Sequence, residues 1–458
     1  MLYKKHLIWL LVLLVQAAVV FSGRAYTAKD ANTIFSAYNS AFYMQKGTNG
    51  YIKDTQTGNE AYFWVQANMI ECYVDAWEWN SNATAQVMIT NLLNGFISYN
   101  GSGWTYNDYN DDIMWAVMAF ARGGVATGRT NYCDIAKANF DACYARAWST
   151  NLGGGLYWRN SDKQSKNACV NGPGSIAAYL LYQIYGDTNY LNKATNIYAW
   201  ERAVLFNTGN GAIYDNIGTN SVIGTWSSSY NQGTFLGAAN FLGQTNDAKL
   251  AAQFTMQYLT GGGIMPEYGI AGNNSGFNAI YWRWFTRFMK ARNLQGTYES
   301  WLQTNAVAAW NVRRTADNLS WCQWLHPSPA GTNFYSWDCI SSFEILQAAD
   351  PTQGAAAQSI AKNFSGYYPL DASSGTVAVD AAGSANDGVV SGATWSSGGR
   401  FNNCLTFNGA SSSVQITNLI CNDFSIAFWV KTTQTPGGGQ WYNGAGLVDG
   451  DAPLNNDD

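Results

Sequence analysis

The chain has 458 residues, of which 12% are charged and 15% aromatic, and its formal net charge is −5. This length predicts two or three domains, and the slightly acidic balance excludes the basic surface typical of nucleic-acid-binding proteins. The only histidines are His6 and His326, which argues against histidine-based metal sites and Ser-His-Asp triads. Carboxylates remain as the abundant acid–base groups, so we expect chemistry without a metal or a cofactor.

Residues 1–25 have the pattern of a secretory signal peptide. Lys4 and Lys5 precede a mostly apolar run from Leu7 to Phe21, which ends in the small-residue segment around Ala25. The run is shorter than the about 20 apolar residues that a membrane-spanning helix needs. We therefore expect an exported protein, secreted or extracytoplasmic, that leaves the membrane when the signal is removed.

The eight cysteines of an exported chain could form disulfides. Three pairs are close in sequence and are plausible bridges: Cys133/Cys143, Cys322/Cys339 and Cys404/Cys421. The spacing alone does not determine the connectivity.

From residue 26 to 350 the pattern is helical. Apolar periodicity predicts twelve helices, at Ala28–Phe42, Tyr62–Trp79, Ala83–Phe96, Asp111–Ala121, Asp134–Trp148, Gly174–Tyr185, Leu191–Leu205, Thr234–Leu242, Ala248–Leu259, Phe277–Ala291, Ser300–Arg313 and Trp337–Ala349. Several connections are rich in glycine, including Gly153–Gly155 and Gly261–Gly263. Because one helical hairpin cannot bury its apolar face alone, six hairpins closing into an all-α (α/α)6 toroid are the predicted architecture.

After residue 350 the composition changes. Residues 351–363 are predicted to be a linker, and residues 364–458 show short alternating strands separated by turn residues, which is an all-β pattern. The predicted strands are Thr376–Val379, Gly388–Val390, Ala393–Trp395, Cys404–Phe407, Ser413–Ile416 and Ser425–Trp429.

Two adjacent carboxylates, Asp111 and Asp112, lead directly into the apolar run from Ile113 to Phe120. An acidic first turn of a helix is the ordinary explanation, because the N-terminus favours negative charge. Neighbouring carboxylates also raise each other's pKa, and pairs with separated pKa values are what glycosidic bond cleavage requires. The abundance of Trp and Tyr in a weakly charged exported protein favours the second interpretation.

An ordered series of segments resembles glycoside hydrolase family 76, the endo-α-1,6-mannanases. The series consists of Phe63-Trp64, Tyr109-Asn110-Asp111-Asp112, Gly153-Gly154-Gly155-Leu156-Tyr157-Trp158, Lys166-Asn167-Ala168 with Asn171-Gly172-Pro173, and Tyr230-Asn231-Gln232-Gly233. The resemblance implies an (α/α)6 barrel that hydrolyses mannan with retention of configuration. It also implies that Asp111 is the nucleophile and Asp112 the general acid/base, which in retaining enzymes requires carboxyl groups about 5–5.5 Å apart.

Further residues are candidates for substrate binding, each with a structural alternative. Trp64, Trp115, Trp158 and Tyr230 could stack on sugar rings or fill the core, and the glycine-loop setting favours the cleft for Trp158. Asn231 and Gln232 could bind hydroxyl groups or cap the next helix, and Lys166 and Asn167 could bind substrate or position that helix. Asp108 could tune the aspartate pair or be a solvated loop residue. The late segment from Phe277 to Trp284 departs from the family's Phe-Lys-Gly type of sequence.

The β-rich region is similar to the opening strands of a concanavalin-like (laminin-G-like) jelly-roll sandwich, and we expect it to be incomplete. Complete domains of this kind commonly bind glycan with calcium, although the residues present show no calcium site. The leading hypothesis is a monomeric, secreted endo-α-1,6-mannanase acting on mannan or α-1,6-manno-oligosaccharides. The alternatives are a cell-wall transglycosidase that uses the same two aspartates and a non-catalytic mannan-binding protein.

Overall fold

The computed structural model describes residues 27–349 and, further along, residues 366, 368–380, 386–399, 403–416, 426, 428 and 430–432. The predicted signal peptide and the predicted linker lie outside these residues. The chain divides into two compact units, Met1–Asp350 and Pro351–Asp458.

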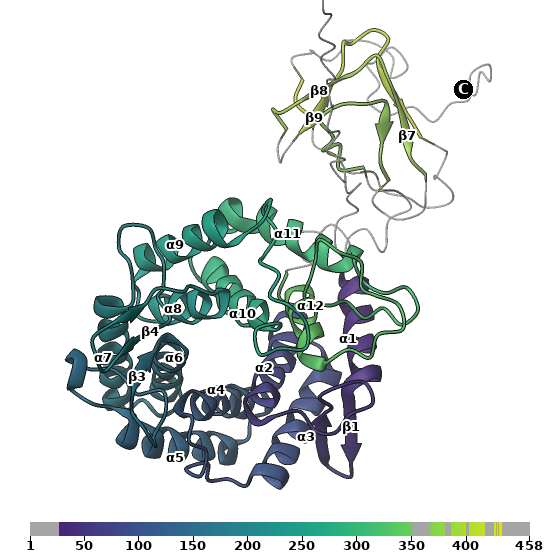
Figure 1. The fold of residues 1–458 in the computed structure, drawn as a ribbon. Helices are drawn as coiled ribbons and strands as arrows, with labels where there is room; N and C mark the ends of the chain where they lie inside the picture. The colour runs from purple at the N-terminus through teal and green to yellow at the C-terminus, as the bar shows by residue number, and fades with distance from the viewer. Residues whose placement is uncertain are drawn as a thin grey trace, which may run out of the picture. The chain divides into compact units, whose positions relative to one another are not determined.

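The first unit contains twelve α-helices among its described residues. They are α1 Ala28–Phe42, α2 Phe63–Asn80, α3 Ala83–Asn100, α4 Asn110–Thr127, α5 Thr130–Ala147, α6 Ala168–Tyr185, α7 Thr188–Val204, α8 Ser229–Phe241, α9 Thr245–Phe254, α10 Phe277–Ala291, α11 Gln295–Asn311 and α12 Ser336–Ala348. Each even-numbered helix packs on the next even-numbered helix. Helix α12 packs on α2, which closes an inner ring. The odd-numbered helices lie outside this ring (Figure 1). The predicted (α/α)6 toroid is confirmed.

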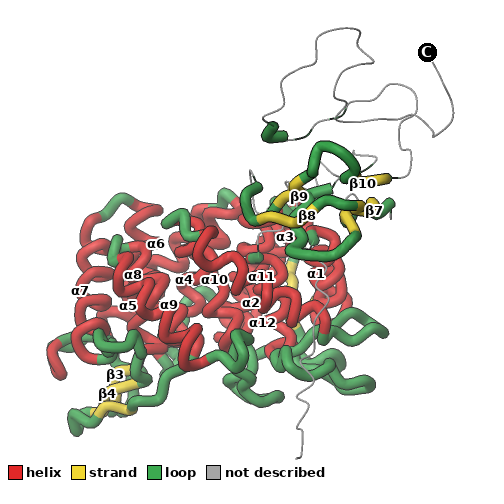
Figure 2. The backbone as a smooth tube through the Cα atoms, turned by 90° about the horizontal axis from the view of Figure 1, so that it is seen from above, coloured by secondary structure: helices red, strands yellow, loops and turns green. Residues whose placement is uncertain are grey.

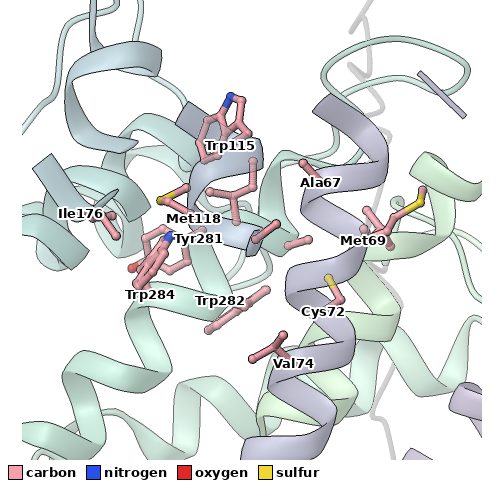
Figure 3. Close-up of a cluster of buried hydrophobic side chains, with 14 of the residues drawn as sticks. Ala67, Met69, Cys72, Val74, Trp115, Met118, Ile176, Tyr281, Trp282 and Trp284 are labelled. Carbon is pink, nitrogen blue, oxygen red and sulfur yellow. The ribbon is translucent and has the colours of Figure 1, made fainter. Parts of the chain in front are cut away.

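The inner helices are apolar around most of their circumference because both neighbours and the outer ring cover them. In α4 every residue from Asp112 to Gly124 is buried, and in α12 every residue is. Side chains from α2, α4, α6 and α10 meet in the centre, where Trp115 and Met118 lie near Trp284 (Figure 3). A helix that is apolar on all sides needs such complete cover.

The loops at one end of the ring carry short strands (Figure 2). These are the hairpin of β1 Tyr43–Lys46 with β2 Asn49–Ile52 and the antiparallel sheet of β3 Ser165–Asn167, β4 Asn216–Gly218 and β5 Ile223–Gly224. A short 3-10 turn, η1 Asn151–Gly153, and a π-helical turn, η2 Thr255–Leu259, complete the connections. The β3–β5 sheet joins the segments before α6 and α8.

Helix α6 begins earlier than the apolar pattern predicts, at Ala168 instead of Gly174. The first turns include Pro173, which lacks an N–H donor and usually ends a helix. The Asn171 side chain holds this turn, because its amide donates to the carbonyls of Asn167 and Leu156 and its oxygen accepts from Leu156 N. None of the helices in the described part of the chain has the length and apolar character of a membrane span.

The second unit contains five short strands among its described residues: β6 Val377–Ala378, β7 Gly388–Ser391, β8 Thr394–Ser396, β9 Cys404–Thr406 and β10 Ser413–Gln415. They form an antiparallel sheet of order β10-β7-β6 and the pair β8-β9. A small core of Ala378, Val390 and Leu405 lies beneath them. Five of the six predicted strands overlap these elements, and the segment Ser425–Trp429 falls largely outside the described residues.

The described cysteines are free thiols, so the predicted bridges Cys133–Cys143 and Cys322–Cys339 are absent. Cys133 and Cys143 both lie on α5, ten residues apart (143 − 133). At a rise of about 1.5 Å per residue they are about 15 Å apart along the helix, beyond the about 7 Å that a disulfide spans between Cα atoms. Cys404 is also a free thiol, and its predicted partner, Cys421, lies outside the described residues.

Candidate active site

The N-terminal ends of the inner helices meet at one end of the toroid. A chain of side-chain contacts links them. Tyr62, the residue before α2, hydrogen-bonds Asp112 in the first turn of α4. Asp111 lies beside Cys169 at the start of α6, and Cys169 lies beside Tyr230 at the start of α8. Tyr230 stacks on Phe277, the first residue of α10, with ring centroids 3.8 Å apart. This end of the ring is the candidate site.

The first turn of α4 is held in place by Asn110. Its amide donates to the carbonyl of Tyr157 at 2.8 Å, and its oxygen accepts from Arg146 Nε at 2.7 Å. Its backbone N–H donates to the carbonyl of Trp158. The glycine-rich loop is therefore fastened to the helix that carries both aspartates, and Trp158 lies beside them.

Asp112 is buried and well supplied with donors. Asn107 Nδ2 donates to Asp112 Oδ2 at 3.0 Å, and the Tyr62 hydroxyl forms a second hydrogen bond with the carboxyl group. Tyr62 itself is 58% exposed, so this side of Asp112 is open to a ligand. Donors of this kind stabilise a carboxylate.

Asp111 is half-buried, and its Oδ1 accepts no hydrogen bond from any described residue. The Cys169 thiol and the Trp158 indole lie beside its carboxyl group. A buried carboxyl oxygen without a donor is rare in folded proteins and needs an explanation. Of the carboxyl oxygens of this pair, Oδ1 of Asp111 is the one that is buried without a protein partner.

Burial is the main cause of a raised pKa at both aspartates. The negative charge of Asp112 raises the pKa of Asp111 further, whereas Asn107 and Tyr62 act against burial at Asp112. Because two close carboxylates resist simultaneous ionisation, the pair retains one proton around neutral pH. One protonated and one ionised carboxyl group can act together as acid and nucleophile or base.

The other candidates near the pair fall into two groups. The site contains Trp158, Tyr230 and Asn231. Trp64 lies at the start of α2 and packs edge-on against Trp337, with the ring centroids 4.8 Å apart. Asn231 Nδ2 donates to Asp215 Oδ1 at 3.2 Å, while its own Oδ1 has no donor among the described residues. Trp158, Tyr230 and Trp64 are partly exposed and can face a ligand, whereas Asn231 is fully buried.

Two further candidates, Lys166 and Gln232, bond to backbone groups of the protein instead. Lys166 is buried, and its Nζ donates to the carbonyls of Ser149, Asn151 and Gly154 at 2.5–2.8 Å. Burial lowers the pKa of Lys166 to about 8. Gln232 is buried with both ends of its amide bonded to backbone groups at Ile213, Gly211 and Ala251. These positions suit supports of the loops, because no polar group is left for a sugar.

Trp115 is only 3% exposed and packs in the core, so it cannot present a face to a ligand in this structure. Asp108 accepts from Ser161 and pairs with Arg159 at 3.2 Å, which holds the loop after the glycines. Asn167 is buried and its Oδ1 accepts from Ser165. These placements correspond to the structural alternatives that the sequence left open.

Four residues of the site were not predicted from the sequence. Tyr62, Asn107 and Cys169 contact the aspartate pair, and Asp215 bonds Asn231 and Asn216. Burial raises the pKa of the Cys169 thiol most, and the nearby charges of Asp111 and Asp215 raise it further, so these carboxylates lie near the same group. A sequence signal for Asp215 was available, since Asp215 directly follows residues 209–214, a glycine-containing connection between two predicted helices. In the described part of the chain, no group of His, Cys, Asp or Glu side chains is arranged to hold a metal ion.

An adjacent pair of carboxyl groups at one end of an (α/α)6 toroid is an arrangement that glycosidic bond cleavage can use. Comparison with known families agrees. Residues 24–362 match the model of glycosyl hydrolase family 76, and the chain belongs to this family.

Solved structures give the same result. The α-1,6-mannanase of family 76 from Salegentibacter sp. HEL1_6 is 26% identical, with 70% of this chain and 98% of that chain covered and a TM-score of 0.64. An inactive variant of that enzyme, with two consecutive aspartates replaced by asparagine, is in complex with α-1,6-mannotriose and has a TM-score of 0.65. Dfg5 from Chaetomium thermophilum, in complex with glucosamine, shares the fold at 16% identity, with 71% of this chain and 89% of that chain covered and a TM-score of 0.60. A comparison with curated protein sequences gives no match.

Proposed function

We propose that this protein is an exported endo-α-1,6-mannanase that hydrolyses mannan backbones with retention of configuration. The observation that carries the proposal is the adjacent pair Asp111 and Asp112 in the first turn of α4, where Asp112 is buried and one carboxyl oxygen of the half-buried Asp111 lacks a protein partner. The likeness to the Salegentibacter mannanase, whose variant lacking two consecutive aspartates is inactive, supports the substrate and the pair.

The reaction has two steps. Asp112, carrying the shared proton, protonates the leaving glycosidic oxygen while an Asp111 oxygen attacks the anomeric carbon, which forms a covalent mannosyl-enzyme. Asp112, now ionised, removes a proton from water, and the resulting hydroxide displaces Asp111 from the anomeric carbon. Both aspartates return to their starting state.

The proton of the pair must lie on Asp112 when the substrate is cleaved. In the free protein, Asn107 and Tyr62 stabilise an ionised Asp112, whereas Asp111 has no donor on Oδ1. A sugar whose anomeric carbon develops positive charge beside Asp111 favours the ionised form of Asp111. Substrate binding is therefore expected to shift the proton to Asp112.

Substrate binding is assigned to the groups that remain open at the site. Trp158, Tyr230 and Trp64 offer aromatic surface to pyranose rings, and the partly exposed Asp215, held by Asn231 Nδ2, offers acceptor oxygens to hydroxyl groups. A site that hydrogen-bonds hydroxyl groups discriminates strongly against ligands that lack them.

The test is incubation of the chain, without its signal peptide, with linear α-1,6-mannan. The wild type is expected to release short manno-oligosaccharides whose first-formed reducing ends are α-anomers. Asp111→Asn and Asp112→Asn should each lower the rate by about 10²–10⁴-fold, because each removes a group that acts in the transition state. Asp134→Asn, on the exposed face of α5, is the matched control and should retain full activity.

Other products would decide against hydrolysis by retention. First-formed β-anomers would show inversion. Transfer of mannosyl units to an added manno-oligosaccharide acceptor, without net hydrolysis, would identify a transglycosidase. Mannan binding without any products would identify a binding protein.

We also propose that residues 364–458 belong to a concanavalin-like glycan-binding domain joined by the linker 351–363. Calcium titration of the chain that includes this region, followed by its thermal unfolding, tests whether the domain binds calcium. Sedimentation of the same chain tests the expected monomer.

A further inference from the structure

The connection from β5 to α8 carries an exposed tryptophan. Trp226 is 48% exposed, whereas every other tryptophan that the structure describes is buried or half-buried. The aromatic contacts found nearby join Tyr230 and Tyr268 to Phe277 and do not include Trp226. A tryptophan stabilises a fold mainly through the apolar area that it removes from water, so this one adds little to the core. Its ring is open to a partner outside the chain.

Trp226 is joined to the candidate active site through the β3–β5 sheet, whose strands β3 and β4 lie beyond the helix ends at the loop end of the ring (Figure 2). The N–H of Asp215 donates to the carbonyl of Gly224 at 3.0 Å. Trp226 follows Gly224 by two residues, a backbone reach of about 7 Å. On the other side, Ser227 Oγ donates to the carbonyl of Ile213 at 2.8 Å. The backbone of this segment is therefore held next to the strand that begins after Asp215.

The aspartate pair lies between two exposed aromatic residues. On the α2 side, Tyr62 hydrogen-bonds one aspartate of the pair and is 58% exposed. On the α8 side, Asp215 and the other aspartate both lie near Cys169, and Trp226 lies beyond Asp215. Because α2, α4, α6 and α8 follow one another around the inner ring (Figure 1), these two aromatic residues flank the pair on opposite sides. A ligand that contacts both must be an extended chain.

The segment that carries Trp226 is uncharged. From residue 216 to residue 246 the sequence contains no Asp, Glu, Lys, Arg or His. Val222 and Ile223, just before Trp226, are exposed apolar residues. Residues 219–221 are exposed and carry hydroxyl or amide side chains. The surface therefore combines apolar area with neutral hydrogen-bonding groups.

Charged side chains near the start of β3 do not change this balance. Asp108 and Asp162 are negative and Arg159 and Lys163 are positive, and Arg159 pairs with both aspartates. Asp215 adds a negative charge at the edge nearest the aspartate pair, so this side of the site does not favour an acidic ligand. A neutral chain of sugars, with hydroxyl groups and apolar ring faces, fits this surface.

From these observations we infer that Trp226 is a distal aromatic platform for the substrate. It binds a mannose unit of the α-1,6-linked chain that lies beyond the units held at the aspartate pair. The inference rests on the proposed mannanase function and adds to it a residue that sets the preference for long chains. Binding energy from remote substrate units can be used at the reacting centre, so loss of the platform should slow the cleavage of long chains and spare short ones.

The test compares kcat/KM on α-1,6-manno-oligosaccharides, from the shortest that the wild type cleaves up to mannohexaose, and on linear mannan. Trp226→Ala should leave the shortest substrate within about twofold of the wild type and lower kcat/KM on mannohexaose and mannan about three- to tenfold. Trp226→Phe keeps an aromatic face and should retain most of the preference, whereas Trp226→Leu should behave as Trp226→Ala. Tyr185→Ala, an exposed aromatic residue at the opposite end of α6, is the matched control and should leave every substrate unaffected.

Binding is measured separately by calorimetry in a chain with Asp111→Asn and Asp112→Asn, with and without Trp226→Ala. Mannohexaose should bind about three- to tenfold more weakly without Trp226. If the wild type fails to cleave mannan while this difference persists, the proposed hydrolysis is wrong and the platform stands. If mannan is cleaved and Trp226→Ala changes neither rates nor binding, the platform is wrong and the hydrolysis stands.

Three other outcomes would also overturn the platform. Equal losses on short and long substrates would show that Trp226 supports the fold or the aspartate pair instead. Wild-type preference in Trp226→Leu would exclude stacking on an aromatic face. A change in sedimentation caused by Trp226→Ala, with unchanged kinetics, would identify this surface as a contact with a second copy of the chain.

Discussion

At the scale of single residues, the two aspartates differ in what surrounds them. Burial and mutual repulsion raise the pKa of Asp111 to about 8, and burial raises that of Asp112 to about 6. Below the lower value both groups are protonated and the nucleophile is lost; above the higher value both are ionised and the acid is lost. The rate of mannan hydrolysis should therefore be bell-shaped, with its maximum between about pH 6 and pH 8.

Tyr62→Phe tests which donor sets the acidic limb of this profile. The Tyr62 hydroxyl lowers the pKa of Asp112, so its removal should raise that pKa and move the acidic limb upward by roughly 0.4–1 pH unit. Tyr106→Phe is the matched control, because Tyr106 is similarly exposed and donates to the carbonyl of Asn100 instead. A limb that stays in place in Tyr62→Phe would contradict the assignment.

At the scale of elements, the glycine loop before β3 positions Trp158 beside Asp111. Gly153 and Gly155 both have positive φ angles, of 82° and 83°. A Cβ at Gly153 would meet nothing within 4 Å, whereas one at Gly155 would lie 2.3 Å from the ring of Trp200. Gly153→Ala should cost about 1–2 kcal/mol from the left-handed conformation alone. Gly155→Ala should cost more, because Trp200 must also move.

Urea unfolding followed by tryptophan fluorescence measures both variants, and their mannanase rates are read in parallel. Gly155→Ala should also lose activity, since the displaced loop carries Trp158. Equal free energies of unfolding for the two variants would show that Trp200 does not support the loop.

At the scale of the whole molecule, a buried ion network ties the inner ring together. Arg283 on α10 is fully buried and pairs with two carboxylates of α2. Its Nη1 lies 3.0 Å from Glu71 Oε2, and its Nε lies 2.8 Å from Asp75 Oδ2. This arginine lies within the segment from Phe277 to Trp284, which departs from the family's Phe-Lys-Gly type of sequence. Arg283→Met should lower the free energy of unfolding by about 3–5 kcal/mol, because it leaves buried carboxylates without their partner.

Arg202→Met is the control for that measurement. Arg202 pairs with Asp247 on the outer ring and is 45% exposed, so its loss should cost at most about 1 kcal/mol. Urea unfolding of both variants provides the comparison. A cost for Arg283→Met no greater than that of Arg202→Met would show that the network does not hold the ring.

The sequence by itself determined the twelve helices, the toroid and the aspartate pair, because long apolar periods and an adjacent charge pair are local patterns. Only the tertiary structure decided which neighbouring polar groups face the site. Lys166 and Gln232 stand in family-like segments, yet their side chains turn to loop carbonyls, and no local pattern records that direction. Tyr62 and Asp215 reach the site from distant segments. Cys133 and Cys143 remain apart because one straight helix holds both, and that geometry exists only in the folded chain.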